Sequence, residues 1–343
     1  MEKVNYSQIY AKLTKGLSPK TRGIFDRRFG VKTGEVETLE SIGKSLKITR
    51  ERVRQIEEVG FNFVKKNHKE TLDNIFQSFN AYFQEQGGFK KEETVLQDLG
   101  SGKNKPYVLF LLTLGQDQFS RVFGKKDYHY FWATTQTPEN KVKETLSSLV
   151  LDIQNHGKIL TPKELFNNFA GKHSLNEASL ASYIEVSKKI QNNKEGNLGL
   201  VNWPEIRPRG VKDKIFLVFK KEEKPLHFRE IATLIDKLQY HSLNKKAHPQ
   251  TVHNELIKDQ RFVLVGRGMY ALHEWGYVPG TIKDVITKVL KERNEAAYQD
   301  DIVKQVLAQR LVAKNTVLIN LNNKKYFNRD SDGKYFLRET QTA

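Results

Sequence analysis

Residues 49–57 carry the side chains best suited to chemistry in this chain. Five of them can bond to base edges or phosphates: Arg50, Glu51, Arg52, Arg54 and Gln55. In a helix they occupy the outward face of the first two turns, because Val53 and Ile56 begin an apolar stripe on the other side. Arginine pairs with guanine, glutamine pairs with adenine, and glutamate accepts from cytosine. The pattern predicts DNA recognition, although such a charged face is also typical of a solvated helix.

Two short amphipathic helices joined by a tight turn are expected to position these side chains. Leu39, Ile42 and Leu46 recur at helical spacing, and Ile48 ends the turn. Thr49 is a natural N-cap for the second helix, without the acidic residue that completes a capping box. The stretch 38–57 therefore predicts a helix-turn-helix.

The same residues resemble region 4 of bacterial primary sigma factors. The resemblance rests on three runs: from Leu17-Ser18-Pro19 through Arg27-Arg28-Phe29-Gly30, then Thr38-Leu39-Glu40-Ser41-Ile42-Gly43, and then Thr49-Arg50-Glu51-Arg52-Val53-Arg54-Gln55-Ile56-Glu57. It implies a four-helix domain that reads the promoter −35 element and docks on the RNA polymerase flap. By position, it implies that Arg50, Glu51, Arg54 and Gln55 approach bases and that Arg28 and Thr38 lie near phosphates.

The chain departs from that family in two ways. Its second helix continues into Glu58-Val59-Gly60-Phe61, where the family usually has basic residues, which puts some phosphate contacts in doubt. No upstream sigma regions precede the module, so we expect something other than a complete sigma factor. For a polymerase contact we expect the apolar surface around Leu17, Ile24, Phe25 and Phe29, where the two phenylalanines are also candidates for the core.

Composition favours a soluble, cytoplasmic and nucleoid-associated protein of several small domains. The 343 residues include 57 Lys and Arg against 40 Asp and Glu, a net charge of +17 that suits a polyanionic partner. No apolar run is long enough to span a membrane, and no signal-peptide core is present. The chain has no cysteine and nine scattered histidines, so we expect no disulfide, no metal and no cofactor.

After a helix at residues 1–16, and one long or two shorter helices at residues 61–83, the chain repeats a pattern. Each repeat has a helix, a short extended piece, a second helix, a third helix and two strands. The second helices are expected at Glu92–Leu99, Pro162–Phe169, Phe228–Ile235 and Gln299–Leu307. We name residues 1–66 the sigma-like module and the rest the first (67–137), second (138–208), third (209–278) and fourth (279–343) repeats. The prediction is a mainly α protein: a helix-turn-helix domain and about four tandem winged helix-turn-helix units with β-hairpin wings.

Trp132, Trp203 and Trp275 recur at intervals of 71 and 72 residues and mark this period. Each is expected to end a wing strand as a plug in the core.

The third repeat resembles the HARE-HTH family of winged helices, found in the RNA polymerase delta subunit and beside some restriction enzymes. The resemblance rests on His227–Ala232, His248–Leu256 and Arg261–Leu272. Pro249 suits the first turn of a helix. The candidate DNA contacts here are Lys245, Lys246, Gln250, Thr251, Asn254 and the wing-tip Arg267. Protein binding by these winged helices is the alternative.

Two glycine-rich stretches fail as enzyme motifs. Gly266-Arg267-Gly268 lacks the third glycine of a dinucleotide fingerprint and joins two strands, and Gly100-Ser101-Gly102-Lys103 lacks both the first glycine and the magnesium-binding hydroxyl of a phosphate loop. We interpret the first as a hairpin and the second as a turn between helices. With no catalytic grouping and no small-molecule site, we expect a binding protein and no enzyme.

The preferred function is a sequence-specific transcription factor that binds double-stranded DNA and associates with core RNA polymerase at its flap. The alternatives are an architectural, nucleoid-type DNA binder and a DNA-binding accessory subunit of a nuclease system.

Overall fold

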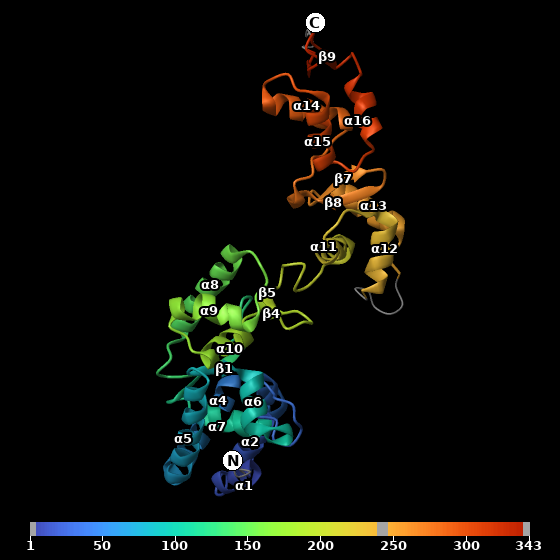
Figure 1. The fold of residues 1–343 in the computed structure, drawn as a ribbon. Coiled ribbons are helices and arrows are strands. Elements are labelled where there is room, and N and C mark those ends of the chain that lie inside the picture. Colours follow the sequence, from blue (N-terminus) through green and yellow to red (C-terminus); the bar gives the residue numbers. More distant parts are fainter. Residues whose placement is uncertain (1–4, 239–245, 339–343) are drawn as a thin grey trace. The chain divides into compact units, whose positions relative to one another are not determined.

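The computed structural model describes residues 5–238 and 246–338 (Figure 1). The described residues are mainly helical, with small antiparallel sheets between the helices. They form two compact units, the N-terminal unit Met1–Asn202 and the C-terminal unit Trp203–Ala343.

The N-terminal unit begins with four helices: α1 (Tyr6–Leu13), α2 (Pro19–Arg28), α3 (Leu39–Leu46) and α4 (Arg50–Asn67). A side-chain oxygen of the preceding residue caps each of them, from Asn5, Ser18, Thr38 and Thr49 respectively. Such caps satisfy amide groups that the first helical turn leaves unpaired. The predicted cap at Thr49 is confirmed, and it lacks a capping box as expected.

Helices α3 and α4 form the predicted helix-turn-helix around a small core of their own. Ile42 and Val53 are fully buried with Ile24 of α2. The turn needs Gly43, since a Cβ there would lie 2.7 Å from the carbonyl oxygen of Ile48. Leu46 was expected on the apolar stripe but is 37% exposed, because the chain turns directly after it.

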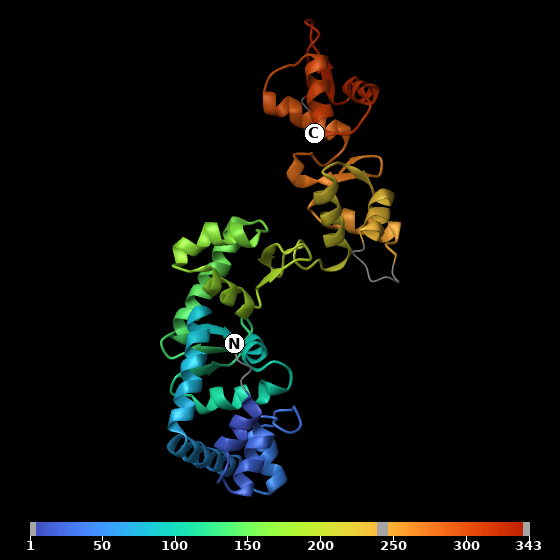
Figure 2. The same ribbon diagram turned by 60° about the horizontal axis from the view of Figure 1, so that its bottom comes forward.

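Residues 61–83 belong to two helices, as one of the two predicted alternatives has it. Helix α4 ends at Asn67 and α5 (Lys69–Glu85) begins after His68, and Figure 2 shows the two helices meeting at an angle. Most apolar residues of the stretch are buried, but Phe63 is 36% exposed.

The first repeat follows the predicted order of elements. It contains β1 (Phe89–Lys91), α6 (Glu92–Gly100), the 3-10 turn η1 (Gly102–Asn104), α7 (Lys105–Leu114), β2 (Phe119–Val122) and β3 (Phe131–Thr134). The strands form an antiparallel sheet in the order β1-β3-β2, with α5 as the helix that precedes it.

The second repeat has the same order in a reduced form. It contains α8 (Glu139–His156), α9 (Pro162–His173), α10 (Glu177–Val186), β4 (Ile190–Asn192) and β5 (Leu198–Leu200). A single bridge between Leu160 and Leu198 stands where the first strand would be.

The C-terminal unit contains the other two repeats. The third has α11 (Gly210–Glu222), β6 (Leu226–His227), α12 (Phe228–Lys237), α13 (Pro249–Lys258), β7 (Phe262–Gly266), β8 (Met269–Leu272) and η2 (His273–Trp275), with the sheet order β6-β8-β7. The fourth has α14 (Ile282–Arg293), α15 (Gln299–Gln309), α16 (Lys314–Leu321), β9 (Phe327–Arg329) and β10 (Tyr335–Leu337), with an Ala297–Tyr335 bridge in place of a first strand. All four second helices begin at the predicted residue.

The tryptophan prediction is correct for only one of three residues. Trp132 lies inside β3 and is 2% exposed. Trp203 and Trp275 follow the hairpins instead, in a turn and in η2, and both are only half-buried. Trp275 packs its ring against Phe219, with 5.8 Å between centroids. The three tryptophans are therefore nearly equally spaced in the sequence, but they do not occupy equivalent positions in the structure.

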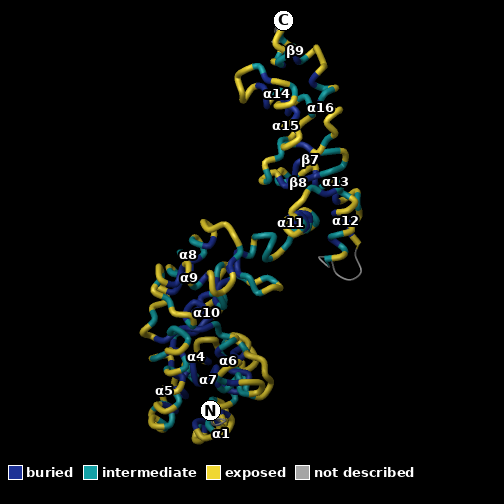
Figure 3. Tube along the Cα trace, in the orientation of Figure 1, coloured by how far each residue is buried: buried dark blue, intermediate teal, exposed yellow. Residues whose placement is uncertain are grey.

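The sigma-like module and the first repeat share one hydrophobic core. Aromatic rings from both meet around Phe110 of α7, which is fully buried and lies 5.0–6.0 Å from its neighbours Tyr10, Phe25, Phe29 and Phe61. Figure 3 shows buried residues gathered around α4 and α7. The division into five segments stays a prediction, and one hydrophobic core crosses the boundary between the first two of them.

Candidate nucleic-acid interface

Helix α4 presents the predicted base-reading side chains on one exposed face. Arg50, Glu51, Arg52, Arg54 and Gln55 are all exposed. Val53 is buried and Ile56 packs on the core of the helix-turn-helix, so the two sides of the helix are separated as predicted. The capped first turns are free for a groove of DNA.

The charged groups on this face pair with one another. Arg54 bonds to Glu51 at 2.7 Å and to Glu58 at 3.1 Å, and Arg52 donates to the Gln55 side-chain oxygen at 3.0 Å. The hydrogen bond from Arg54 lowers the pKa of Glu51, so this carboxylate stays ionised at neutral pH. In the absence of a partner, the charges on this face are therefore largely satisfied by one another.

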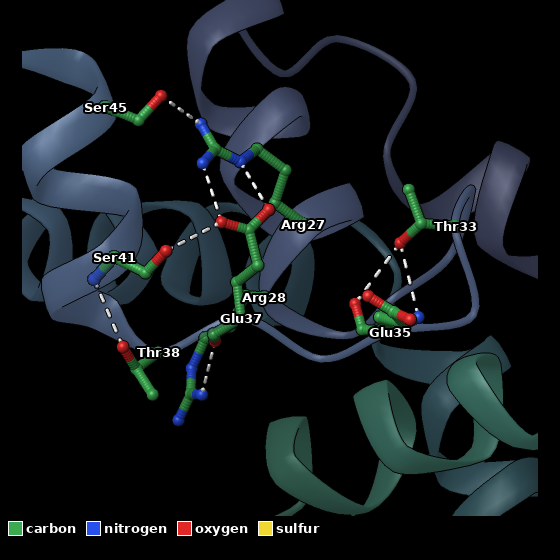
Figure 4. Close-up of polar contacts among 8 residues, drawn as sticks. All are labelled: Arg27, Arg28, Thr33, Glu35, Glu37, Thr38, Ser41 and Ser45. Carbon is green, nitrogen blue, oxygen red and sulfur yellow. Dashed lines mark hydrogen bonds and ion pairs between the residues drawn. The ribbon is translucent and has the colours of Figure 1, made fainter.

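A polar network fixes the loop that leads into α3 (Figure 4). Arg27 makes a double hydrogen bond to the Glu37 carboxylate at 2.6 and 2.7 Å and a third bond to Ser45 at 3.0 Å. Because a bidentate Arg–carboxylate pair is geometrically specific, it sets the approach of residues 33–38 to α3. Thr38 then caps α3 by accepting from the Ser41 amide at 3.1 Å.

Arg28 lies between this loop and α4. Its guanidinium donates to the Glu37 carbonyl at 3.0 Å and lies 3.6 Å from the Glu57 carboxylate. Burial raises the pKa of Glu57, and the charge of Arg28 opposes that rise. The Arg28 side chain retains 28% exposure, which leaves part of the guanidinium open to a phosphate.

Helix α13 presents a second polar start. Gln250, Thr251 and Asn254 are exposed, and the Gln250 amide donates to Asn254 at 3.2 Å. Pro249 occupies the first turn as predicted. Lys246 and the wing residue Arg267 are exposed, whereas Lys245 lies outside the described residues.

Helix α16 has a third polar N-terminal turn, which was not among the predicted DNA-binding sites. Lys314, Asn315 and Thr316 are exposed on its first turn. They occupy the place in the fourth repeat that Gln250 and Thr251 occupy in the third. Comparing the starts of the third helices across repeats would have found them.

The corresponding helices of the first two repeats are buried. Six of the ten residues of α7 are buried, including Leu109, Phe110 and Leu111. Helix α10 packs on β1 through Tyr183, whose ring lies 4.7 Å from that of Phe89. Both third helices therefore use a large part of their surface for packing against the rest of the protein.

The surface expected to meet RNA polymerase is wrong for Ile24, and for Phe25 and Phe29 the alternative of a core position is confirmed. Ile24, Phe25 and Phe29 are at most 3% exposed, and Leu17 is half-buried. Ile24 belongs to the helix-turn-helix core, and α7 covers the two phenylalanines through Phe110. The sequence could not show this, since α7 comes from a later segment of the chain.

The two glycine-rich stretches have the predicted forms. Residues 100–103 connect α6 to α7, and residues 266–268 connect β7 to β8. Within residues 5–238 and 246–338, no three His, Asp or Glu side chains are grouped to hold a metal ion. No described helix is long and apolar enough to cross a membrane.

Comparisons with known proteins agree with both resemblances. Residues 15–66 match Sigma-70, region 4, and residues 209–275 match HARE-HTH, a helix-turn-helix domain whose description names ASXL and restriction endonuclease. RNA polymerase sigma factor SigA of Nostoc sp. (strain PCC 7120 / SAG 25.82 / UTEX 2576) is 46% identical over 46 residues, which are 13% of this chain and 12% of SigA. The chain thus spans about an eighth of that relative. It contains a Sigma-70 region 4 domain at residues 15–66 and a HARE-HTH domain at residues 209–275.

Proposed function

We propose that this protein is a sequence-specific transcription factor that binds double-stranded DNA through α4 and performs no catalysis. One observation carries the proposal: within a domain that matches Sigma-70 region 4, five polar and charged side chains share the exposed first turns of α4. A helix of this kind docks in the major groove with its N-terminal residues on base edges.

All four repeats are proposed to be winged helices with divided roles. The third and fourth keep exposed polar starts on α13 and α16 and supply further DNA contacts. The first and second use α7 and α10 for internal packing, so their third helices support the sigma-like module and do not contact DNA. A single domain buries a small area on DNA, so additional contacts raise the affinity of the whole chain.

Substitution of α4 tests the proposal. A binding site is first selected from random duplexes, and affinities for that site and for a scrambled one are then measured by fluorescence anisotropy. Arg54→Ala and Gln55→Ala should each weaken binding to the selected site by roughly five- to 150-fold, with a smaller loss on the scrambled site.

Arg293→Ala and Gln154→Ala serve as matched controls, because both residues lie on helices outside the interface. The controls should bind as the unmodified protein does. Equal affinities for both duplexes in every variant would contradict sequence-specific recognition and favour an architectural role.

Association with core RNA polymerase is a further part of the proposal, supported by the similarity of residues 15–66 to a sigma factor domain. Burial of Phe25 and Phe29 means that any contact must use another surface. The full chain should co-elute with core polymerase in the absence of DNA. Separate elution at micromolar concentrations would contradict the polymerase part of the proposal and would not affect the DNA-binding part.

A further inference from the structure

The connection between β2 and β3, residues 123–130, exposes an unusual pair of aromatic rings. We call it the wing loop. Phe123 is 64% exposed and Tyr130 is 47% exposed, and their rings lie edge to face with 5.9 Å between centroids. Two exposed lysines, Lys125 and Lys126, lie between them in the chain. Exposed aromatic residues beside basic ones are typical of nucleic-acid contacts.

A partly buried ion pair holds the rings in place. The Arg121 guanidinium lies 5.6 Å from the Phe123 ring and 5.4 Å from the Tyr130 ring. It also makes a double hydrogen bond to Glu92 at 2.5 and 2.6 Å, and Trp132 donates to the same carboxylate at 2.9 Å. The rings are therefore ordered before any partner arrives, which lowers the entropic cost of binding.

The second repeat holds the wing loop in place through hydrogen bonds. The His129 amide donates to the Val186 carbonyl at 2.8 Å, and the Lys188 amide donates to the Asp127 carbonyl at 2.9 Å. The Lys188 ammonium also donates to the Lys125 carbonyl at 2.6 Å. These bonds extend pairing from the loop to residues 186–188 and give the second repeat a structural role.

Cations outnumber carboxylates around the wing loop. The basic side chains are Lys91, Arg121, Lys125, Lys126, Lys188 and Lys189, against Glu92, Glu93 and Asp127. Burial lowers the pKa of His129, and the charges of Lys91 and Lys188 lower it further against the opposing charge of Glu93. Such a surface attracts a polyanion.

A groove connects the wing loop to the sigma-like module. It has a volume of about 270 Å³, and its lining includes Arg28, Val36, Gln116, Arg121 and Phe123. Arg28 in this lining also lies 3.6 Å from the Glu57 carboxylate, so the groove reaches the side of α4 three residues after Arg54. One polyanion can follow this path from α4 to the wing loop.

We propose that the wing loop binds the minor groove and phosphates of the duplex that flanks the site read by α4. Lys125 and Lys126 contact phosphates, and Phe123 and Tyr130 lie against sugars and base edges. Duplex DNA is favoured over a protein partner because the surface is cationic and continuous with Arg28 and α4. This inference rests on the proposed function of α4.

The test compares two duplexes with the full chain. The short duplex holds only the selected site, and the long one adds about one helical turn, roughly 10 base pairs, on each side. Phe123→Ala/Tyr130→Ala should bind the long duplex roughly 25-fold more weakly, because two aromatic contacts are lost and each contributes at least about fivefold, and should bind the short duplex unchanged. Lys125→Gln/Lys126→Gln should lower the slope of log affinity against log salt on the long duplex by about 2, since each phosphate contact contributes about 0.9.

Leu151→Ala and Lys158→Gln/Lys163→Gln are the matched controls, because these exposed residues lie on or beside α8 and α9. Far-UV circular dichroism verifies that each variant is folded. Wing variants that match their controls on the long duplex overturn the inference. The same variants are also measured on single-stranded DNA of the same sequence, and a loss of affinity seen only there also overturns the inference. If α4 variants still lose the selected site in that case, the proposed function survives; if unmodified protein shows no site preference, the proposed function itself fails.

Discussion

Arg54 has a double role on α4 because two carboxylates hold it before DNA binds. Glu51 and Glu58 both bond to it, and both carboxylates are exposed. Removing Arg54 leaves two carboxylates without their cation near the phosphates. We therefore expect Arg54→Ala to lose more affinity than Gln55→Ala, and the difference between them to shrink as salt rises.

Residue-scale predictions were correct where neighbours in sequence decide the outcome. Thr49 caps its helix and Pro249 opens one because both effects depend on the adjacent turn. For Phe25 the sequence left two alternatives, the surface and the core. The choice between them depends on packing between segments far apart in the chain, since Phe25 packs against Phe110.

At the scale of elements, the order of helices and strands could be predicted from the sequence. Which of the third helices are buried and which are exposed was not predicted. Each repeat shows the predicted order because hydrophobic period and turn residues act locally. Helix α7 (KPYVLFLLTL) is apolar on all sides, and such a helix is buried on all sides. This composition could have indicated from the sequence that α7 is a core helix and not an exposed recognition helix.

The shared core around α7 leads to a prediction on stability. Phe110→Ala removes a ring that contacts Phe25, Phe29 and Phe61, so it should lower the free energy of unfolding by about 3–5 kcal/mol. Because the core joins the sigma-like module to the first repeat, both should unfold in one weakened transition. Urea unfolding followed by circular dichroism and by tryptophan fluorescence measures this.

Phe336→Ala is the control, since this phenylalanine is 38% exposed on β10. It should change the transition of the N-terminal unit very little. A sigma-like module that keeps its stability while the first repeat loses its own would show that the two cores are independent.

At the scale of the whole molecule, the five predicted segments are grouped into two compact units. The sequence could not predict this grouping, because it depends on how α7 and α10 pack across segment boundaries. Each unit has hydrophobic clusters of its own: residues around Phe110 and Val53 in the first, and around Ile215 and Val289 in the second. Separate cores imply that each unit can fold alone.

The last prediction concerns fragments 1–202 and 203–343. Each should unfold cooperatively, because no cluster named above crosses residues 202–203. Fragment 1–202 should keep the preference for the selected site, since it contains α4, while fragment 203–343 should bind selected and scrambled duplexes with similar affinity. In the full chain the two units are covalently joined, so once α4 has bound, the contacts of α13 and α16 become intramolecular. The full chain should therefore bind a long duplex roughly 100-fold more tightly than fragment 1–202. Equal affinities of the full chain and fragment 1–202 on every duplex would mean that α13 and α16 serve proteins instead of DNA.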